Sequence, residues 1–103
     1  MEIVKVNGKN FEDEVLKSEK PVLLDFFANW CGPCKMLSPV IHEIAEEFDE
    51  YKVCQVDVDE EGALATRYNV ISIPTLVVIK NGEVLKTSVG FRQKEEILKM
   101  LED

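Results

Sequence analysis

The apolar positions of this chain form two kinds of pattern, short continuous runs and longer stretches with helical spacing. Residues 21–27 are the most apolar run and show little alternation, which predicts a strand covered on both faces, as in the centre of an α/β sheet. From residue 37 onward the apolar positions recur at helical spacing and predict a long helix with one buried face. These positions are Leu37, Val40, Ile41, Ile44, Ala45 and Phe48. Pro39 falls inside this helix and should kink it.

The other segments complete an alternating order of strands and helices. Further strands are expected at residues 3–6, 52–58, 76–79 and 84–88, and further helices after residue 10, at 63–68 and at 93–101. Asn10 is the expected cap of the first helix, because its side chain can accept a backbone N–H. Asn81-Gly82 is typical of a two-residue hairpin, so the last two strands should be antiparallel. The order βαβαβαββα predicts an α/β fold with one central sheet and helices on both faces.

Length and charge narrow the possible functions. The 103 residues suffice for a single domain over positions 1–103, and 46% of them are apolar, enough for a sizeable core. The net charge of −8 argues against a nucleic-acid partner, which requires clustered Lys and Arg. Acidic residues between Glu43 and Glu61 are expected to form a solvated face, or alternatively to help dock a basic partner. With no apolar run near 18 residues and no signal-peptide pattern, we expect a cytoplasmic protein without membrane contact.

The main chemical feature is a pair of cysteines three residues apart, within Trp30-Cys31-Gly32-Pro33-Cys34-Lys35. At the start of a helix this spacing permits either a dithiol or a disulfide. The helix N-terminus and Lys35 should lower the pKa of Cys31 and favour its thiolate. We therefore expect Cys31 to be the exposed nucleophile and Cys34 the more buried, resolving thiol. Gly32 would let a partner chain approach, and Pro33 suits the first turn and stiffens it.

Other interpretations of the cysteine pair have less support. Zinc needs about four ligands, and the chain offers only Cys54 and His42 beside the pair, so no metal is expected. Haem attachment requires a histidine where Lys35 stands. A purely structural disulfide closing so small a loop would remove little chain entropy. Cys54 itself is expected to be an inert core thiol, with a regulatory or dimerising thiol as the alternative, and His42 a surface residue.

Asp25 is the most unusual residue of the apolar strand at 21–27. Burial without a partner would raise the pKa of its carboxyl group. It could accept the proton of Cys34 during resolution, or it could be an Asp that reaches water at the end of the strand. Pro74 follows Ile73 at the start of a later strand, and from spacing alone a trans bond is the usual outcome.

Several motifs, in order along nearly the whole chain, resemble those of the thioredoxin family. They are Asp25 followed by Ala28 to Lys35, Pro39, Ile73-Pro74-Thr75, Lys80-Asn81-Gly82 and Val89-Gly90. The resemblance implies a thioredoxin fold, with a central mixed five-stranded sheet flanked by four helices. It implies that Pro74 is cis and lies beside Cys31, where it contributes to substrate binding with Trp30, Ile73 and Phe91. It also implies that Asp25 is a buried acid and that Gly90 lies near the substrate groove.

The resemblance also implies the activity. The expected function is protein-disulfide reduction, in which a Cys31/Cys34 dithiol–disulfide couple carries electrons to target proteins without a cofactor. The partners would be disulfide-containing proteins and a thioredoxin reductase, either NADPH-linked or ferredoxin-linked, and the protein is expected to be a monomer. Gly32 and Pro33 favour the reducing end of the family; a thiol oxidase or isomerase is the alternative on the same fold. A redox-independent binding subunit could dock partners on an apolar surface of Trp30, Ile73, Pro74 and Phe91.

Two positions depart from the pattern of the family. Phe27 stands where a Trp is frequent, which leaves Trp30 as the only Trp of the chain. We expect Trp30 to pack over the cysteine pair and contact partners, with a core anchor as the alternative. Gln55 stands where a Lys is often close to the buried Asp, so Asp25 should be harder to ionise here.

Overall fold

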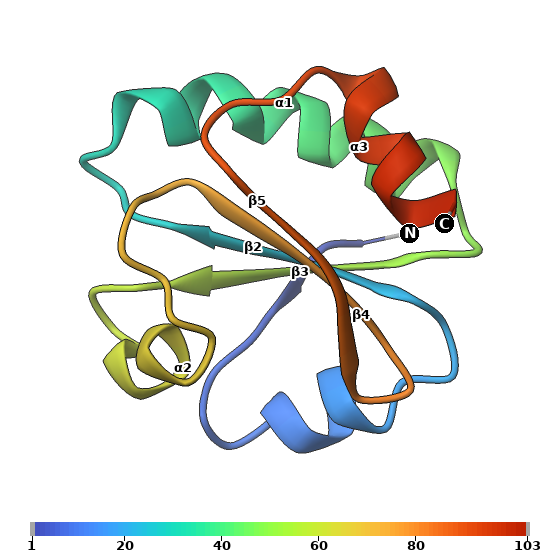
Figure 1. The fold of residues 1–103 in the computed structure, drawn as a ribbon, viewed down its shortest axis with the longest axis horizontal. Coiled ribbons are helices and arrows are strands. Elements are labelled where there is room, and N and C mark those ends of the chain that lie inside the picture. The colour runs from blue at the N-terminus through green and yellow to red at the C-terminus, as the bar shows by residue number, and fades with distance from the viewer. Residues whose placement is uncertain (1, 103) are drawn as a thin grey trace.

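The computed structural model describes residues 2–102, so Met1 and Asp103, the two ends of the expected domain, lie outside the described residues. Five strands form one mixed sheet in the order β1-β3-β2-β4-β5 (Figure 1). The strands are β1 (Val4–Lys5), β2 (Val22–Phe27), β3 (Lys52–Asp57), β4 (Thr75–Lys80) and β5 (Glu83–Val89). The helices within residues 2–102 are a π-helical turn η1 (Glu12–Leu16) and the α-helices α1 (Gly32–Glu47), α2 (Gly62–Arg67) and α3 (Lys94–Glu102). The expected element order and fold class are therefore confirmed.

Strand β2 is the centre of the sheet, as its continuous apolar pattern predicted. It pairs in parallel with β3 and antiparallel with β4. Helices α1 and α3 cover one face of the sheet, and η1 and α2 lie on the other (Figure 1). Leu23 therefore packs against the first pair of helices and Leu24 and Phe26 belong to the core on the opposite face, all fully buried. Each such side chain contributes roughly 1.5–3 kcal/mol through burial, so the strand that leads into the cysteine pair is firmly held.

Helix α1 presents the predicted apolar stripe to the sheet. Leu37, Ile41, Ile44 and Ala45 are buried, and Val40 and Phe48 pack against the same core. Pro39 lies inside this helix; the kink expected there stays a prediction. Lys94, at the start of α3, donates a hydrogen bond to Glu43 Oε1 (2.7 Å) and also pairs with Glu47. These contacts join the two helices that cover one face of the sheet.

The first helix differs from the prediction, because Asn10 does not cap it. The side chain of Asn7 accepts the N–H groups of Lys9 and Asn10 at 2.8 and 3.0 Å, and so closes the turn that precedes η1. The Asn10 amide instead donates to the Lys5 carbonyl at 3.0 Å, and its oxygen accepts the Asn7 N–H. Residue 11 precedes η1 without a side-chain cap.

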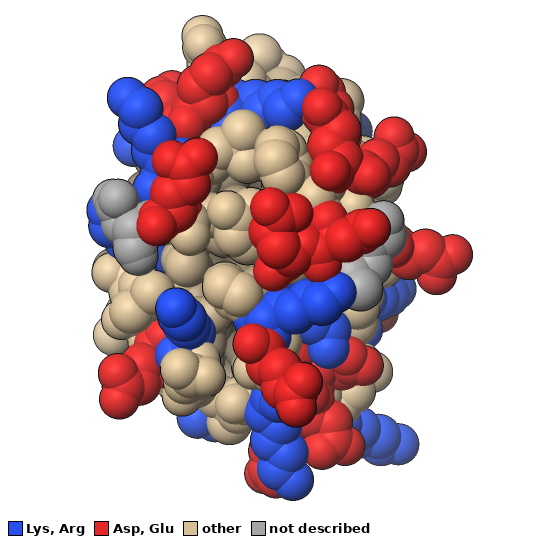
Figure 2. Space-filling view, turned by 90° about the vertical axis from the view of Figure 1, so that its right-hand side faces the viewer, with Lys and Arg blue, Asp and Glu red and all other residues tan. Residues whose placement is uncertain are grey.

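The hairpin between β4 and β5 is confirmed. Asn81 and Gly82 have φ values of 53° and 80°, the left-handed conformation that a two-residue hairpin of this kind requires. None of the helices formed by residues 2–102 combines the length and apolar composition needed to cross a membrane. The face shown in Figure 2 carries acidic side chains interrupted by Lys and Arg, rather than a continuous basic surface.

Candidate active site

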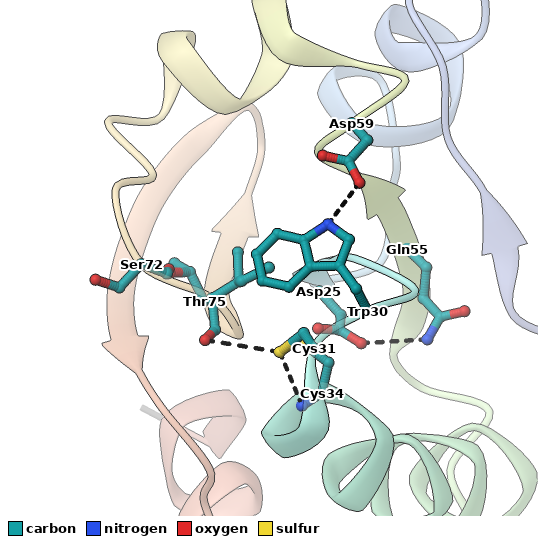
Figure 3. The surroundings of a disulfide bond; sticks show 9 residues. Asp25, Trp30, Cys31, Cys34, Gln55, Asp59, Ser72 and Thr75 are labelled. Carbon is teal, nitrogen blue, oxygen red and sulfur yellow. Dashed lines mark hydrogen bonds between the residues drawn. A yellow bond between two sulfur atoms is a disulfide. The ribbon is translucent and has the colours of Figure 1, made fainter.

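The cysteine pair lies where β2 ends and α1 begins. Cys31 and Cys34 form a disulfide, with 5.2 Å between their Cα atoms. Cys31 is the N-cap of α1, and its Sγ accepts the backbone N–H of Cys34 at 3.1 Å (Figure 3). Such unpaired N–H groups and the helix dipole stabilise negative charge at this end of a helix. Cys31 therefore lies at the helix N-terminus, the position that was expected to favour its thiolate.

The two residues between the cysteines fit the helix start. Pro33 is in the first turn of α1, where its missing N–H leaves no helical hydrogen bond unmade. A Cβ atom added at Gly32 would meet nothing within 4 Å. Packing within the chain therefore does not require a glycine at this position. The space over Gly32 is open to an approaching molecule.

The predicted contrast in exposure between the two cysteines is wrong for the disulfide form. Cys31 is 4% exposed and Cys34 is 7% exposed, so both are buried. The reason is the segment before β4, which comes from far along the chain and covers Cys31. The Ile73 carbonyl oxygen lies 3.9 Å from Cys31 Sγ. What distinguishes the two cysteines is their surroundings: Cys31 is at the helix cap beside Ile73, and Cys34 lines a cavity.

The segment with Pro74 lies beside Cys31, as the resemblance implied. The Ile73–Pro74 peptide bond is cis. The Pro74 carbonyl accepts the N–H of Gly90 at 2.8 Å, and Gly90 has a φ of 93°, which favours glycine. Pro74 itself is buried, so the expectation that its side chain forms part of an exposed docking surface is wrong. Ile73 is partly exposed and Phe91 is 37% exposed.

Trp30 is a surface residue beside the disulfide. It is 70% exposed, so the alternative of a core anchor is wrong. Its Nε1 donates a hydrogen bond to Asp59 Oδ2 at 2.8 Å (Figure 3). Asp59 was not among the site residues predicted from the sequence. The signal was its position just after β3, since the carboxyl ends of neighbouring parallel strands meet at the same edge of a sheet.

Asp25 is buried behind the disulfide, 3% exposed. It lines a cavity of about 160 Å³ together with Cys34, Lys35, Ser38 and Gln55, and with parts of residues 27–29. Oδ2 accepts a hydrogen bond from Gln55 Nε2 at 3.2 Å, whereas Oδ1 is buried without a partner among the described residues. The alternative of an Asp that reaches bulk water at a strand end is therefore wrong.

Burial raises the pKa of Asp25 from 3.8 to about 6, and the hydrogen bond from Gln55 opposes this rise. A carboxyl group with a pKa near 6 can hold or release a proton close to neutral pH, which suits proton exchange with a thiol. The place of Asp25 in the cavity that Cys34 also lines brings the two groups to one small space.

The remaining candidate residues lie apart from this site. Cys54 is fully buried in β3, and burial raises the pKa of its thiol to about 12. His42 is on the exposed side of α1, where Nδ1 donates to the Ser38 carbonyl at 2.9 Å. Residues 2–102 contain no group of three or more His, Cys, Asp or Glu side chains placed to hold a metal ion.

Comparison with known proteins agrees with this geometry. The family model described as Thioredoxin matches residues 2–103. A thioredoxin of Bacillus subtilis is 49% identical over 102 residues, which cover 98% of this chain and 96% of that protein. A thioredoxin of Haemophilus influenzae is 45% identical over 93% of this chain and 91% of its own length. Among solved structures, a mutant thioredoxin from Halobacterium salinarum superposes with a TM-score of 0.90 at 38% identity, covering 98% of this chain and 88% of that one.

Proposed function

Because this chain belongs to the thioredoxin family, we propose a specific division of work among the residues of its site. The chain is a protein-disulfide oxidoreductase that acts by thiol–disulfide exchange through Cys31 and Cys34. In the proposed division Cys31 is the nucleophile, Cys34 the resolving thiol and Asp25 the proton acceptor. Lys35 favours the Cys31 thiolate, and Gly32 and Pro33 set the redox potential of the cysteine pair.

The reaction begins with the reduced protein. The Cys31 thiolate attacks one sulfur of a substrate disulfide, which forms a mixed disulfide and releases the other substrate sulfur as a thiolate that takes up a proton. Cys34 then loses its proton and attacks Cys31 Sγ. The Cys31–Cys34 disulfide forms, the second substrate sulfur leaves as a thiolate, and two electrons have passed to the substrate. The chemistry uses Cys31 and Cys34, with no separate cofactor.

Asp25 supports the second step. Cys34 is buried, so its proton is transferred more effectively to a nearby base than to bulk water. Asp25 lines the same cavity as Cys34 and has a pKa raised to about 6 by burial. The carboxylate can therefore take the Cys34 proton and later return it to solvent.

We further propose how the cycle is closed. The disulfide form requires two electrons from a thioredoxin reductase, and the reduced form gives them to disulfide-containing proteins that dock near Trp30, Ile73, Pro74, Gly90 and Phe91. A monomer in a reducing compartment such as the cytoplasm fits this electron-carrier role. The observation that carries the proposal is the Cys31–Cys34 disulfide at the N-terminus of α1, with Cys31 Sγ accepting a helix N–H.

The test is reduction of insulin disulfides with dithiothreitol as the electron source. The wild type should accelerate the reaction, and Cys31→Ser should abolish the acceleration. Cys34→Ser should retain attack but stall as a mixed disulfide, so it should capture target proteins covalently. Retention of the same partners by both serine variants, without covalent capture, would instead support the binding-subunit alternative.

A further inference from the structure

Thr75 is a buried polar residue at the start of β4, next to the segment that covers Cys31. It is the first residue of β4, pairs with Phe26 in β2 and with Val89 in β5, and is 2% exposed. A buried hydroxyl is costly unless it is hydrogen-bonded. The Thr75 hydroxyl donates to the Ser72 carbonyl, and both residues appear in the close view of the disulfide (Figure 3). This bond spans the short segment that covers Cys31.

The segment between α2 and β4 is solvent-exposed on its outer side. Ile71 is 95% exposed and Ser72 is also exposed. Exposed chain of this kind is mobile unless specific contacts hold it. The bond from Thr75 to Ser72 is made by a side chain that is itself fixed in the sheet. This hydrogen bond therefore restricts the motion of the residues just before β4.

The backbone of Ile73, the residue after Ser72, lies against the cysteine pair. The Ile73 carbonyl oxygen lies 3.9 Å from Cys31 Sγ, and the Pro74 carbonyl accepts the Gly90 N–H. Between the Ser72 and Pro74 carbonyls, both of which are held, the Ile73 backbone has little freedom to move away from the sulfur. A peptide whose disulfide reaches Cys31 must pass next to this backbone.

We propose that Thr75 is a positioning residue for protein substrates, whose hydroxyl holds the Ser72–Pro74 backbone in place as a docking edge beside Cys31. This inference rests on the proposed function, because it assumes that a peptide disulfide is attacked at Cys31. Ordering the edge before binding reduces the entropy that a peptide substrate must lose. A small disulfide reagent, which makes no backbone contacts, gains nothing from it.

The experiment compares Thr75→Val, which keeps the shape and removes the donor, with Thr75→Ser, which keeps the donor. Each reduced protein is mixed with insulin and, separately, with the small disulfide reagent dithionitrobenzoate, and second-order rate constants are measured. For Thr75→Val we expect the insulin rate constant to fall about tenfold, the effect of losing one well-placed hydrogen bond. Its rate constant with dithionitrobenzoate should stay within about twofold of wild type. Thr75→Ser should behave as wild type with both.

The control is Thr87→Val on the exposed part of β5, which makes the same chemical change away from the site and should alter neither rate. An unchanged insulin rate in Thr75→Val, an equal fall with both substrates, or an equal loss in Thr75→Ser would overturn the proposal. If Thr75→Val does not fold, Thr75→Ala against Thr75→Ser gives the same comparison of donor absent with donor present. Wild type that reduced neither substrate would overturn the proposed function itself, a different result from a selective failure with insulin.

Discussion

Gln55 lies directly opposite Asp25 on the neighbouring parallel strand and donates a hydrogen bond from Nε2 to Asp25 Oδ2 at 3.2 Å. The bond favours the ionised carboxyl group, yet burial outweighs it and the pKa of Asp25 remains raised to about 6. The neutral amide of Gln55 therefore stabilises the Asp25 carboxylate, but less than burial destabilises it. A cation in its place would attract the carboxylate more strongly.

Gln55→Lys should lower the pKa of Asp25, because a positive charge within hydrogen-bonding reach stabilises the carboxylate. Gln55→Met, which removes the hydrogen bond at similar size, should raise it. Titration of the Asp25 carboxyl carbon by NMR measures both changes. An unchanged or higher pKa in Gln55→Lys would refute the assigned relationship.

Asp25 should also make stability depend on pH. Its pKa is raised from 3.8 to about 6, which at 1.36 kcal/mol per pH unit corresponds to about 3 kcal/mol. Because the folded state binds the proton more tightly than the unfolded state, the folded protein loses this stability as pH rises from about 4 through about 6. Asp25→Asn should therefore be more stable than wild type by up to about 3 kcal/mol near pH 8. Urea unfolding measures the difference, which should shrink toward zero at about pH 3.5; an equal gain at both pH values would contradict the titration of Asp25 as its cause.

The fluorescence of the chain should report the state of the cysteine pair. Trp30 is the only Trp, lies next to Cys31 and is 70% exposed. Because a neighbouring disulfide quenches indole emission, reduction with dithiothreitol should increase the intensity. A variant with both Cys31 and Cys34 changed to Ser is the control and should not respond to dithiothreitol. Equal emission from oxidised and reduced wild type would be the contrary result.

Cys54 should be inert in the folded protein. Its pKa of about 12 and complete burial leave about one molecule in ten thousand as thiolate near pH 8, with no access for a reagent. Brief treatment of the reduced native protein with iodoacetamide should modify Cys31 and leave Cys54 unmodified. In denaturant all three cysteines should react. Peptide mass analysis locates the label, and modification of native Cys54 at a rate similar to that of Cys31 would contradict its assignment as a core thiol.

The local sequence pattern was sufficient to predict an element where residues close in sequence determine its structure. Three elements were predicted because the pattern of their own residues determines their structure. They are the apolar strand β2, the helix α1 with its apolar stripe, and the Asn81-Gly82 hairpin. The spacing of Cys31 and Cys34 likewise set the Cα separation, because one turn of helix joins them.

Prediction failed where distant residues decide between similar local options. Asn7 and Asn10 have the same capping chemistry, and the turn is further held by Glu61, which accepts the Gly8 N–H from 53 residues away. The exposure of Cys31 depends on the Ile73 segment, 42 residues further along. Neither contact has a signal within the local pattern. The partner of Trp30, Asp59, could be recognised only once the order of the strands was known.

The position of β4 between β2 and β5 has a consequence for the chain during its synthesis. A growing polypeptide that has emerged only as far as residue 70 already contains Cys31 and Cys34 but neither Ile73 nor β4. In such a nascent chain the edge of β2 that later pairs with Thr75–Ile79 is bare and apolar, the kind of edge that associates with other chains. Its thiols also lack the segment that buries Cys31. The residues after 70 therefore both complete this part of the sheet and shield the redox pair. A ribosome-bound intermediate stalled before them should be more prone to aggregation and to unwanted oxidation than a chain that contains them.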